Sequence, residues 1–381
     1  MATTYLDHQA TTPCDPAVVA AMAPYWSELF ANPSSGSHRP GLEAAAAVDL
    51  ARCSLARQLG VAPRQVVFTS GATEANNLAI KGLVEARRQR GRHLLTLATE
   101  HRAVLEPLRY LASHGFELTV LPVQPDGLVD LNRFSEALRD DTLLVSVMAA
   151  NNEIGVLQPL AAIGGLCRER GIALHSDGAQ VFGHQAIHPG ELGLDLFSLS
   201  GHKFYGPKGI GALVLAEGIV LAPQQHGGGQ EGGLRGGTLP VPLIVGLQRA
   251  AELASHDWEA RQQRLGGLRD RLLAGLLELG GVQVNGSLEH RLAHNLNVQV
   301  QGVDGTQLHR ALRRQLAVSG GSACSSGSPS HVLAALGLSP SQAAASIRFG
   351  LGRSTEERDI TTALEVITAV LKELSPAAAP G

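Results

Sequence analysis

The sequence predicts an α/β protein whose large domain is built on a mainly parallel sheet and is joined to a smaller α+β domain. Short apolar runs alternate with helical patterns after Gly60 and continue for about one domain length, which is the pattern of an α/β sheet. The 381 residues exceed a typical single core, and this length favours a second domain. Hydrophobic residues form 44% of the chain and charged residues 17%, as in a well-packed globular protein.

The elements of the large domain follow in order along the chain. A stretch rich in alanine and leucine from Gly41 to Leu59 predicts a helix that ends at Gly60, because glycine readily adopts the left-handed conformation that closes a helix. Apolar runs after this helix predict the seven strands of the sheet, with helices in most of the gaps. These runs are Val66–Thr69, His93–Ala98, Glu117–Val123, Leu143–Ala149, Ile172–Ser176, Asp195–Leu199 and Gly211–Leu215.

The second domain mixes helices with fewer strands. Pro240 and Pro242 precede a long helical stretch through about Leu279, which is expected to bridge the two domains. The elements predicted after it are strands at Val282–Val284, Asn295–Val300 and Ile347–Leu351 and a helix near Thr306–Gln315. We therefore assign residues 13–255 to the large domain and residues 1–12 with 256–375 to the small domain.

The C-terminal segment predicts one more helix. It is expected to begin at Ser354, because Glu357 three residues later completes a capping box, and to end near Leu374. Residues 376–381 are rich in alanine and proline and are expected to be a disordered tail.

Charge and hydropathy narrow the class of function. The formal net charge of −3 argues against an electrostatic nucleic-acid binder and favours small molecules and proteins as partners. The N-terminus lacks a basic segment followed by an apolar core, and no apolar run is long enough to span a bilayer. We expect a cytoplasmic protein without a membrane partner.

The four cysteines, Cys14, Cys53, Cys167 and Cys324, are too widely spaced for a metal-binding or redox motif. We expect reduced thiols and no metal site. Cys53 and Cys167 lie in helical stretches, where a free cysteine usually packs as a small apolar group. Cys324 lies in a segment of glycine and serine, residues 320–328, which predicts a mobile, exposed loop. The segment alone leaves open whether this thiol is incidental or reactive.

Lys203 is the first candidate for chemistry. It ends the segment Ser200-Gly201-His202-Lys203, which follows an apolar strand. A lysine at a strand end beside a hydroxyl and an imidazole suits covalent attachment of pyridoxal phosphate, because the amine condenses with the cofactor's aldehyde while its neighbours bind phosphate. Most lysines are solvated surface charges, so this interpretation depends on other groups meeting Lys203.

Three further strand ends supply complementary groups. Thr73 lies where a strand passes through Gly71 into a helix, so that its hydroxyl and the backbone amides can hold a phosphate or form an ordinary helix cap. Asp177 follows a strand, and its carboxylate can either keep a pyridine nitrogen protonated by accepting its hydrogen bond or cap a helix. His101 follows another strand and can stack on a planar cofactor, although a lone histidine is more often structural. Because parallel strands share one carboxyl edge, we expect these groups to meet Lys203.

Together with Lys203, several segments resemble the cysteine desulfurases of the NifS/IscS group. These are fold type I pyridoxal-phosphate enzymes of aminotransferase class V. The similarity covers almost the whole chain. The segments that carry it are Tyr5-Leu6-Asp7, Ala10-Thr11-Thr12-Pro13, Asn32-Pro33-Ser34, Phe68-Thr69-Ser70-Gly71-Ala72-Thr73-Glu74, Thr99-Glu100-His101, Asn151-Asn152-Glu153-Ile154-Gly155, His226-Gly227-Gly228-Gly229, Gly237-Thr238-Leu239-Pro240, Ser322-Ala323-Cys324 and Ile347-Arg348-Phe349.

The resemblance implies a role for each matching residue. Lys203 would bind the cofactor's aldehyde, Asp177 its pyridine nitrogen and Gln180 its ring oxygen. His101 would stack on the ring and move thiol protons. The residues implied to hold the phosphate are Thr73, Ser200 and His202, with Thr238 reaching the opposite subunit of a homodimer. Those implied to bind the substrate carboxylate are Asn32, Asn152 and Arg348; for the arginine the chemistry agrees, since a guanidinium can bind a carboxylate through two parallel hydrogen bonds.

The resemblance also implies a reaction and its partners. L-cysteine would be the substrate, L-alanine the product, and Cys324 the acceptor that carries the sulfur as a persulfide. The sulfur would pass to an acceptor protein, such as an iron-sulfur scaffold or a tRNA-thiolation carrier. The segment after Cys324 is slightly shorter than in well-known members and the extended C-terminal tail is missing, both of which bear on the acceptor. The alternatives are a class V aminotransferase, a selenocysteine lyase, and an interaction subunit without catalysis.

Overall fold

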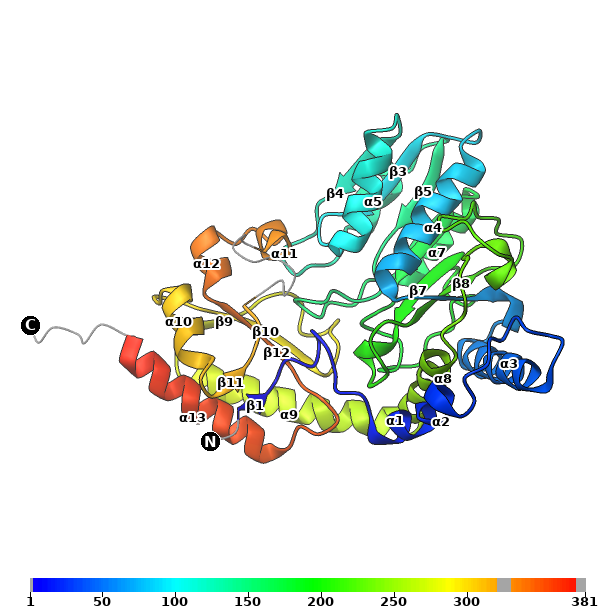
Figure 1. The fold of residues 1–381 in the computed structure, drawn as a ribbon. Helices are drawn as coiled ribbons and strands as arrows, with labels where there is room; N and C mark the ends of the chain where they lie inside the picture. Colours follow the sequence, from blue (N-terminus) through cyan, green and yellow to red (C-terminus); the bar gives the residue numbers. More distant parts are fainter. Residues whose placement is uncertain (1–2, 321–329, 375–381) are drawn as a thin grey trace, which may run out of the picture.

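The computed structural model describes residues 3–320 and 330–374. They form a large α/β part, in which helices cover a sheet, and a smaller part of helices and strands (Figure 1). The large sheet has the strand order β2-β8-β7-β6-β5-β3-β4. Strand β8 is antiparallel to both of its neighbours, and the other pairs are parallel. The strands are β2 (Val66–Thr69), β3 (His93–Leu97), β4 (Glu117–Leu121), β5 (Thr142–Ser146), β6 (Ala173–Asp177), β7 (Leu196–Ser200) and β8 (Gly211–Leu215). The predicted mainly parallel, seven-stranded sheet is confirmed.

Helices cover both faces of this sheet, because its central strands are apolar on both sides. Along β2, Phe68 packs into the core beneath α3 and α8, whereas its neighbour Val67 packs into the core beneath α4 and α5. As predicted, the helix before the sheet ends at Gly60, which has φ 67°. The helices are α1 (Pro16–Met22), α2 (Pro24–Ser27), α3 (Arg39–Leu59), α4 (Ala72–Arg87), α5 (Arg102–Ala112), α6 (Leu131–Ala137), α7 (Leu160–Glu169) and α8 (Val241–Ser255).

The smaller part of the fold has its own hydrophobic core. Its antiparallel sheet has the order β12-β10-β9, and Leu6 from the N-terminal segment packs into the same core as α9 and α13. This separate core supports the proposed division of the chain into residues 13–255 and residues 1–12 with 256–375. The elements are β1 (Thr4–Tyr5), α9 (Trp258–Glu278), β9 (Val282–Val284), β10 (Asn295–Val300), α10 (Gly305–Leu312), β11 (Leu316–Ala317), α11 (His331–Ala335), α12 (Pro340–Ala344), β12 (Ser346–Gly350) and α13 (Glu357–Leu374). The short pair β1 and β11 was not predicted.

Two predicted helix boundaries are wrong. The long helical stretch is divided into α8 and α9 at Asp257, whose φ of 52° interrupts the helix. The last helix begins at Glu357 rather than Ser354, because the turn before it is closed differently. The Thr355 hydroxyl accepts the Gly352 N–H over 2.8 Å, and the Asp359 carboxylate accepts the Glu356 N–H over 2.8 Å.

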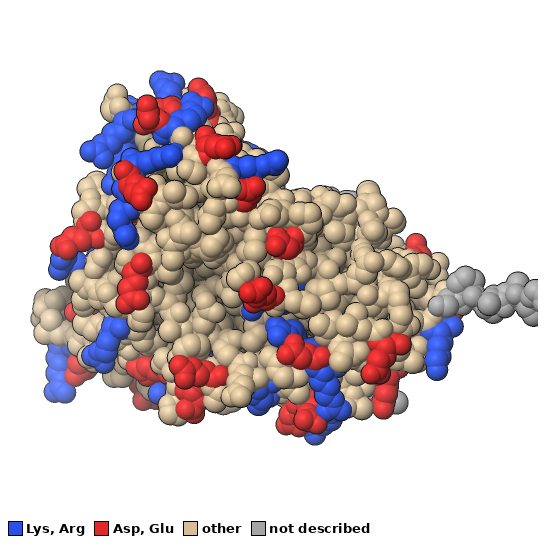
Figure 2. Space-filling view, turned by 180° about the vertical axis from the view of Figure 1, so that it is seen from behind, with Lys and Arg blue, Asp and Glu red and all other residues tan. Residues whose placement is uncertain are grey.

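Charged side chains of both signs lie on the surface of the molecule. Acidic and basic side chains are intermingled on the face shown in Figure 2, in keeping with the small net charge. In residues 3–320 and 330–374 we find no helix that is long and apolar enough to cross a membrane.

Cys167 is buried as predicted, but Cys53 is exposed on α3, so the expectation that it packs inside the protein is wrong.

Candidate active site

A cavity of about 480 Å³ opens where β6 and β7 end, at the carboxyl edge of the large sheet. This is the edge at which open α/β sheets bind their ligands. Arg348 of the small sheet and residues 9–11 of the N-terminal segment complete its wall. The predicted site residues that line the cavity are Thr73, His101, Asn152, Asp177, Gln180, Ser200, His202, Lys203 and Arg348.

Lys203 reaches the cavity from a short 3₁₀ turn, Gly201–Lys203, that directly follows β7. Its Nζ donates to the backbone oxygens of Gln9 at 2.7 Å and Ala10 at 3.0 Å. The N-terminal segment is also tied to the lysine turn at Thr12, whose hydroxyl donates to the His202 carbonyl over 2.9 Å. The amine is therefore held at the cavity wall by a segment that lies almost 200 residues earlier in the chain.

The Asp177 carboxylate lines the cavity at the end of β6. Its Oδ2 accepts a 2.6 Å hydrogen bond from Asn76 Nδ2, and its Oδ1 accepts the Ala179 N–H over 2.9 Å. The contact with Ala179 is a turn cap, and the side chain also faces the cavity. The two interpretations of this residue are thus compatible, and both atoms of the carboxylate are fixed in orientation.

His101 is the N-cap of α5, where its Nδ1 accepts the Ala103 N–H over 3.1 Å. This bond leaves Nδ1 unprotonated and assigns the ring proton to Nε2. Burial lowers the pKa of His101, and the charge of Lys203 lowers it further, while Asp177 opposes the change. A neutral imidazole at the cavity wall can accept or donate a proton near neutral pH.

The start of α4 lines the cavity with Gly71, Ala72 and Thr73. Gly71 precedes the helix with φ 145°, a conformation that suits glycine, and a Cβ there would lie 3.6 Å from Ser200 Oγ. Lys203 and Lys208 line the same cavity, and the amino end of a 16-residue helix adds partial positive charge. These features together can bind an anion such as a phosphate.

His202 adds a neutral imidazole, which can donate a hydrogen bond, to the lining of the cavity. Its Nδ1 lies 3.1 Å from Thr11 Oγ1. Burial lowers the pKa of His202 to about 4, and the charges of Lys203 and Lys208 act in the same direction. The imidazole is therefore uncharged near neutral pH.

Arg348 on β12 brings a buried cation to the cavity wall, where the residue is only 1% exposed. Its Nη1 donates to the Asn152 carbonyl over 2.9 Å. Its Nη2 donates to Asp7 Oδ1 over 2.7 Å and to Ser319 Oγ over 2.8 Å. The Nε atom is buried without a partner among the described residues, so the guanidinium retains capacity to bind a further acceptor.

Two predicted site residues, Asn32 and Thr238, do not line this cavity in the described chain. Asn32 lies in an exposed turn, where its Oδ1 accepts the Ser34 N–H over 2.9 Å. Thr238 is exposed on the loop that precedes α8. Cys324 and the tail 376–381 lie outside the described residues, so the predictions about the cysteine loop and the tail remain predictions.

The structure adds lining residues that sequence reasoning missed. Gln9 and Thr11 enter through the N-terminal segment, and Lys208 follows Lys203 on the same turn region. Of these three residues, Lys208 could most readily have been predicted from the sequence, because it lies in the glycine- and proline-rich segment directly after Lys203. The contact of Lys203 with the Gln9 carbonyl could not be predicted, because every residue has a backbone oxygen and the sequence does not show which one will meet the lysine.

Comparison with known proteins places these residues in a family. The model of the class-V aminotransferase family matches residues 4–362. A cysteine desulfurase, IscS, of Methylococcus capsulatus is 50% identical over 379 residues, which cover 98% of this chain and 94% of the relative. The IscS of Escherichia coli is 48% identical over 381 residues, with the same coverage of 98% and 94%.

Comparison with solved structures supports the same family. A NifS-like protein superimposes with a TM-score of 0.92 at 35% identity and covers 98% of this chain and 100% of its own. SspA, solved in complex with cysteine, superimposes with a TM-score of 0.81 at 39% identity and covers 92% of this chain and 99% of its own. The chain therefore belongs to the class-V aminotransferase family and, within it, to the cysteine desulfurases of the NifS/IscS group.

Proposed function

We propose that this chain is a pyridoxal-phosphate-dependent cysteine desulfurase that converts L-cysteine to L-alanine and carries the sulfur as a persulfide on Cys324. The observation that carries the proposal is the convergence of Lys203, Asp177, His101 and Arg348 on one cavity. An amine, a fixed carboxylate, a neutral imidazole and a buried guanidinium are the groups that such a reaction needs. The identity of nearly 50% to proteins named cysteine desulfurase supports it.

The residues present fit pyridoxal phosphate. The volume of about 480 Å³ lies in the usual range for cofactor sites. The start of α4, with Thr73, Ser200 and His202, would hold the phosphate, and Asp177 would hold a proton at the pyridine nitrogen. Gln180 would contact the ring oxygen. When bound, the cofactor supplies an electrophilic aldehyde and a ring that stabilises negative charge at the substrate carbon.

Lys203 and His101 would then move the protons. Lys203 would hold the cofactor through its aldehyde, and the same Nζ, once displaced by the substrate amine, would be the base for the proton on the substrate's α-carbon. His101, neutral because it is buried, can take the proton of the substrate thiol. Asn76 and Ala179 each donate a hydrogen bond to one oxygen of Asp177, so the carboxylate would keep a fixed orientation toward the ring nitrogen.

Arg348 and Asn152 would orient the substrate by its carboxylate. The guanidinium is already fixed by Asp7, Ser319 and the Asn152 carbonyl, so little freedom is lost when a carboxylate binds. Arg348 comes from β12 of the small sheet, whereas the phosphate would be held at the start of α4 beside the large sheet. The substrate would therefore lie between Arg348 and the start of α4, with its amine toward Lys203. Asn32, which is outside the cavity in this chain, stays a prediction.

Cys324 would accept the sulfur. Its thiolate attacks the substrate sulfur, so that an S–S bond forms while the C–S bond breaks, and the electron pair left on carbon is quenched by a proton. The products are L-alanine and a cysteine persulfide, with no external oxidant. The persulfide would pass its sulfur to an acceptor protein such as an iron-sulfur scaffold.

A homodimer would bring Thr238 to a partner's phosphate. Large apolar side chains between residues 19 and 50 are exposed, which is typical of an interaction surface. They are Val19, Trp26, Leu29, Phe30, Leu42 and Leu50. Leu239, the neighbour of Thr238, lines a cavity together with Ala45 and Val48 of α3, the helix that also carries the exposed Leu42 and Leu50.

The deciding experiment mixes purified protein with L-cysteine and measures alanine and protein-bound persulfide, with Cys324→Ala in parallel. We expect both products from the parent protein and neither from the variant. A keto acid formed with an amino acceptor in place of alanine would establish transamination. Activity on selenocysteine that survives Cys324→Ala would establish a selenocysteine lyase.

A further inference from the structure

The loop of residues 225–238, which we call the glycine-rich loop, carries two charged residues that tie it to neighbouring elements: Glu231 pairs with Arg52 of α3, and Arg235 pairs with Glu74 at the start of α4. Glu231 lies within its 3₁₀ turn, Gln230–Gly233, and Arg235 follows four residues later. Neither residue has a role in the reaction described above. Both form ion pairs that are largely shielded from solvent, unlike the surface pairs elsewhere on the molecule.

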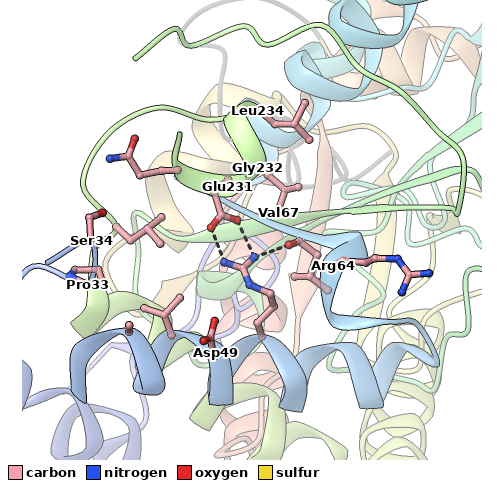
Figure 3. A pocket seen from close by; sticks show the side chains of 14 residues that line it. Pro33, Ser34, Asp49, Arg64, Val67, Glu231, Gly232 and Leu234 are labelled. Atoms are coloured by element: carbon pink, nitrogen blue, oxygen red, sulfur yellow. Dashed lines mark hydrogen bonds and ion pairs between the residues drawn. The ribbon is translucent and has the colours of Figure 1, made fainter. Parts of the chain in front are cut away.

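Glu231 fixes the glycine-rich loop to the outer edge of the sheet (Figure 3). The residue adopts φ 51° and ψ 41°, a left-handed conformation that costs a non-glycine residue energy. Its carboxylate accepts Arg52 Nη1 at 2.9 Å, Arg52 Nη2 at 2.5 Å and the Phe68 N–H at 2.6 Å. Arg52 also donates to the Val66 carbonyl over 2.6 Å. Side chains thus pair with the backbone of edge strand β2, which leads directly into residues 70–73, the turn expected to bind the phosphate, which we call the phosphate turn.

Arg235 reaches the phosphate turn itself. Its Nε donates to Glu74 Oε1 over 2.9 Å, while the other oxygen of Glu74 accepts the Ser70 N–H over 2.7 Å. The backbone at Arg235 is held by a bridge to Gln225, whose carbonyl accepts the Gly236 N–H over 3.0 Å. Glu74 therefore connects the loop to the turn that would bind the phosphate.

Glu74 poses an electrostatic problem in this position. It lines the same cavity as Ser70, Thr73 and His202, so a carboxylate shares the cavity with the expected phosphate. Burial raises the pKa of Glu74, but hydrogen bonds from Arg235 and Ser70 outweigh that effect and lower it overall. The group is thus ionised near neutral pH, and an unpaired anion here would repel a phosphate dianion.

We propose that Arg235 is a positioning residue for the cofactor phosphate: it neutralises Glu74, so that the carboxylate can hold the Ser70 N–H and shape the turn without repelling the phosphate. Arg235 does not line the cavity, so it acts through Glu74 and not by touching the ligand. The inference deepens the proposed function and rests on it, because it requires that the anion bound at α4 is the phosphate of pyridoxal phosphate.

The test measures cofactor release and not turnover. Purified holoprotein is diluted into phosphate-free buffer, and the loss of visible absorbance gives the dissociation constant of pyridoxal phosphate. We expect Arg235→Gln to weaken binding at least tenfold. Glu74→Gln removes the repulsion together with the ion pair, so it should weaken binding less, and the double variant should bind more tightly than Arg235→Gln alone. Arg235→Lys keeps the charge and should bind within about threefold of the parent protein.

Arg64→Gln is the matched control. Arg64 also pairs with a glutamate, Glu217, but their side chains are 70% and 80% exposed. This variant should bind the cofactor like the parent protein. The proposal is overturned if Arg235→Gln binds as tightly as the parent, or if the double variant is as weak as Arg235→Gln.

Two further results separate the proposal from its alternatives. If Arg235→Gln fails to fold, Arg235→Lys and Glu74→Gln still decide the matter, because a tenfold loss in the lysine variant would assign the effect to side-chain shape and overturn the role of charge. A parent protein that binds no pyridoxal phosphate at all would instead refute the proposed function.

Discussion

Asn76 donates a 2.6 Å hydrogen bond from Nδ2 to Asp177 Oδ2, which joins the second turn of α4 to the end of β6 across 101 residues of sequence. Both residues are buried, and Asn76 is 0% exposed. The bond connects the helix that would hold the cofactor phosphate to the carboxylate that would hold the ring nitrogen. One side chain thus sets the separation of the two ends of the proposed cofactor site.

Replacing Asn76 by leucine should impair catalysis more than folding. Without this bond the Asp177 carboxylate loses its fixed position beside the ring nitrogen, and we expect turnover to fall about tenfold, which corresponds to about 1.4 kcal/mol in the activation free energy. Steady-state kinetics with L-cysteine and a thermal melt test this expectation. Asn77→Leu is the matched control, because Asn77 bonds to the Thr73 carbonyl at the helix surface and should leave turnover nearly unchanged. Equal effects of the two substitutions would contradict the role of Asn76.

Arg348→Lys should separate substrate binding from the chemical step. Lysine keeps the charge but cannot reproduce the forked contacts of Arg348 with Asn152, Asp7 and Ser319. We expect KM for L-cysteine to rise at least tenfold while kcat changes less and the visible absorbance of the cofactor is retained. An unchanged KM would show that the substrate carboxylate binds elsewhere.

Two adjacent glycines of α7 should respond in opposite directions to alanine. A Cβ on Gly164 would lie 2.0 Å from the Leu192 carbonyl oxygen, whereas a Cβ on Gly165 would meet nothing within 4 Å. Gly164→Ala should therefore destabilise the protein by about 1–3 kcal/mol through overpacking. Gly165→Ala should stabilise it by about 0.5–1 kcal/mol, because alanine favours the helix. Urea denaturation of the two variants measures both, and a shift of the same sign in both would show that the α7 packing is different.

Stability should fall as the pH is lowered from about 6.5 to 4. Burial lowers the pKa values of His8, His175 and His184 to about 4, whereas histidines in the unfolded chain have pKa values near 6.5. Within this window the unfolded state binds protons that the folded state excludes, so protonation favours unfolding. Each histidine contributes about 1.4 kcal/mol per pH unit over the window, and the dependence on these groups should flatten above pH 7.

The pH prediction can be assigned to one residue. His184 Nε2 donates to the Lys203 carbonyl over 3.0 Å, a bond that glutamine can also make without titrating. Melting temperatures of the parent and of His184→Gln, measured from pH 7.5 to 4.5, should show a shallower decline in the variant. Parallel curves would mean that His184 titrates alike in the folded and unfolded states.

The sequence by itself determined the large sheet and the local chemistry. Buried parallel strands leave continuous apolar runs, and the carboxyl ends of such strands meet at one edge, which is why Lys203 and Asp177 were expected together and are found together. The membership of the family also follows from sequence, because its motifs are contiguous. Helix limits set by a single backbone conformation, such as the left-handed Asp257, were not predictable, since aspartate in that conformation has no distinctive pattern.

Only the tertiary structure decided which distant groups meet. The Gln9 carbonyl on Lys203, the Asp7 carboxylate on Arg348, and the pairing of Arg235 with Glu74 each join segments far apart in the chain. Thr238 and Asn32, although identified by motif, lie outside the cavity in one chain. Local sequence records the preferences of neighbouring residues, whereas these contacts depend on how complete layers pack, and that is a property of the folded molecule.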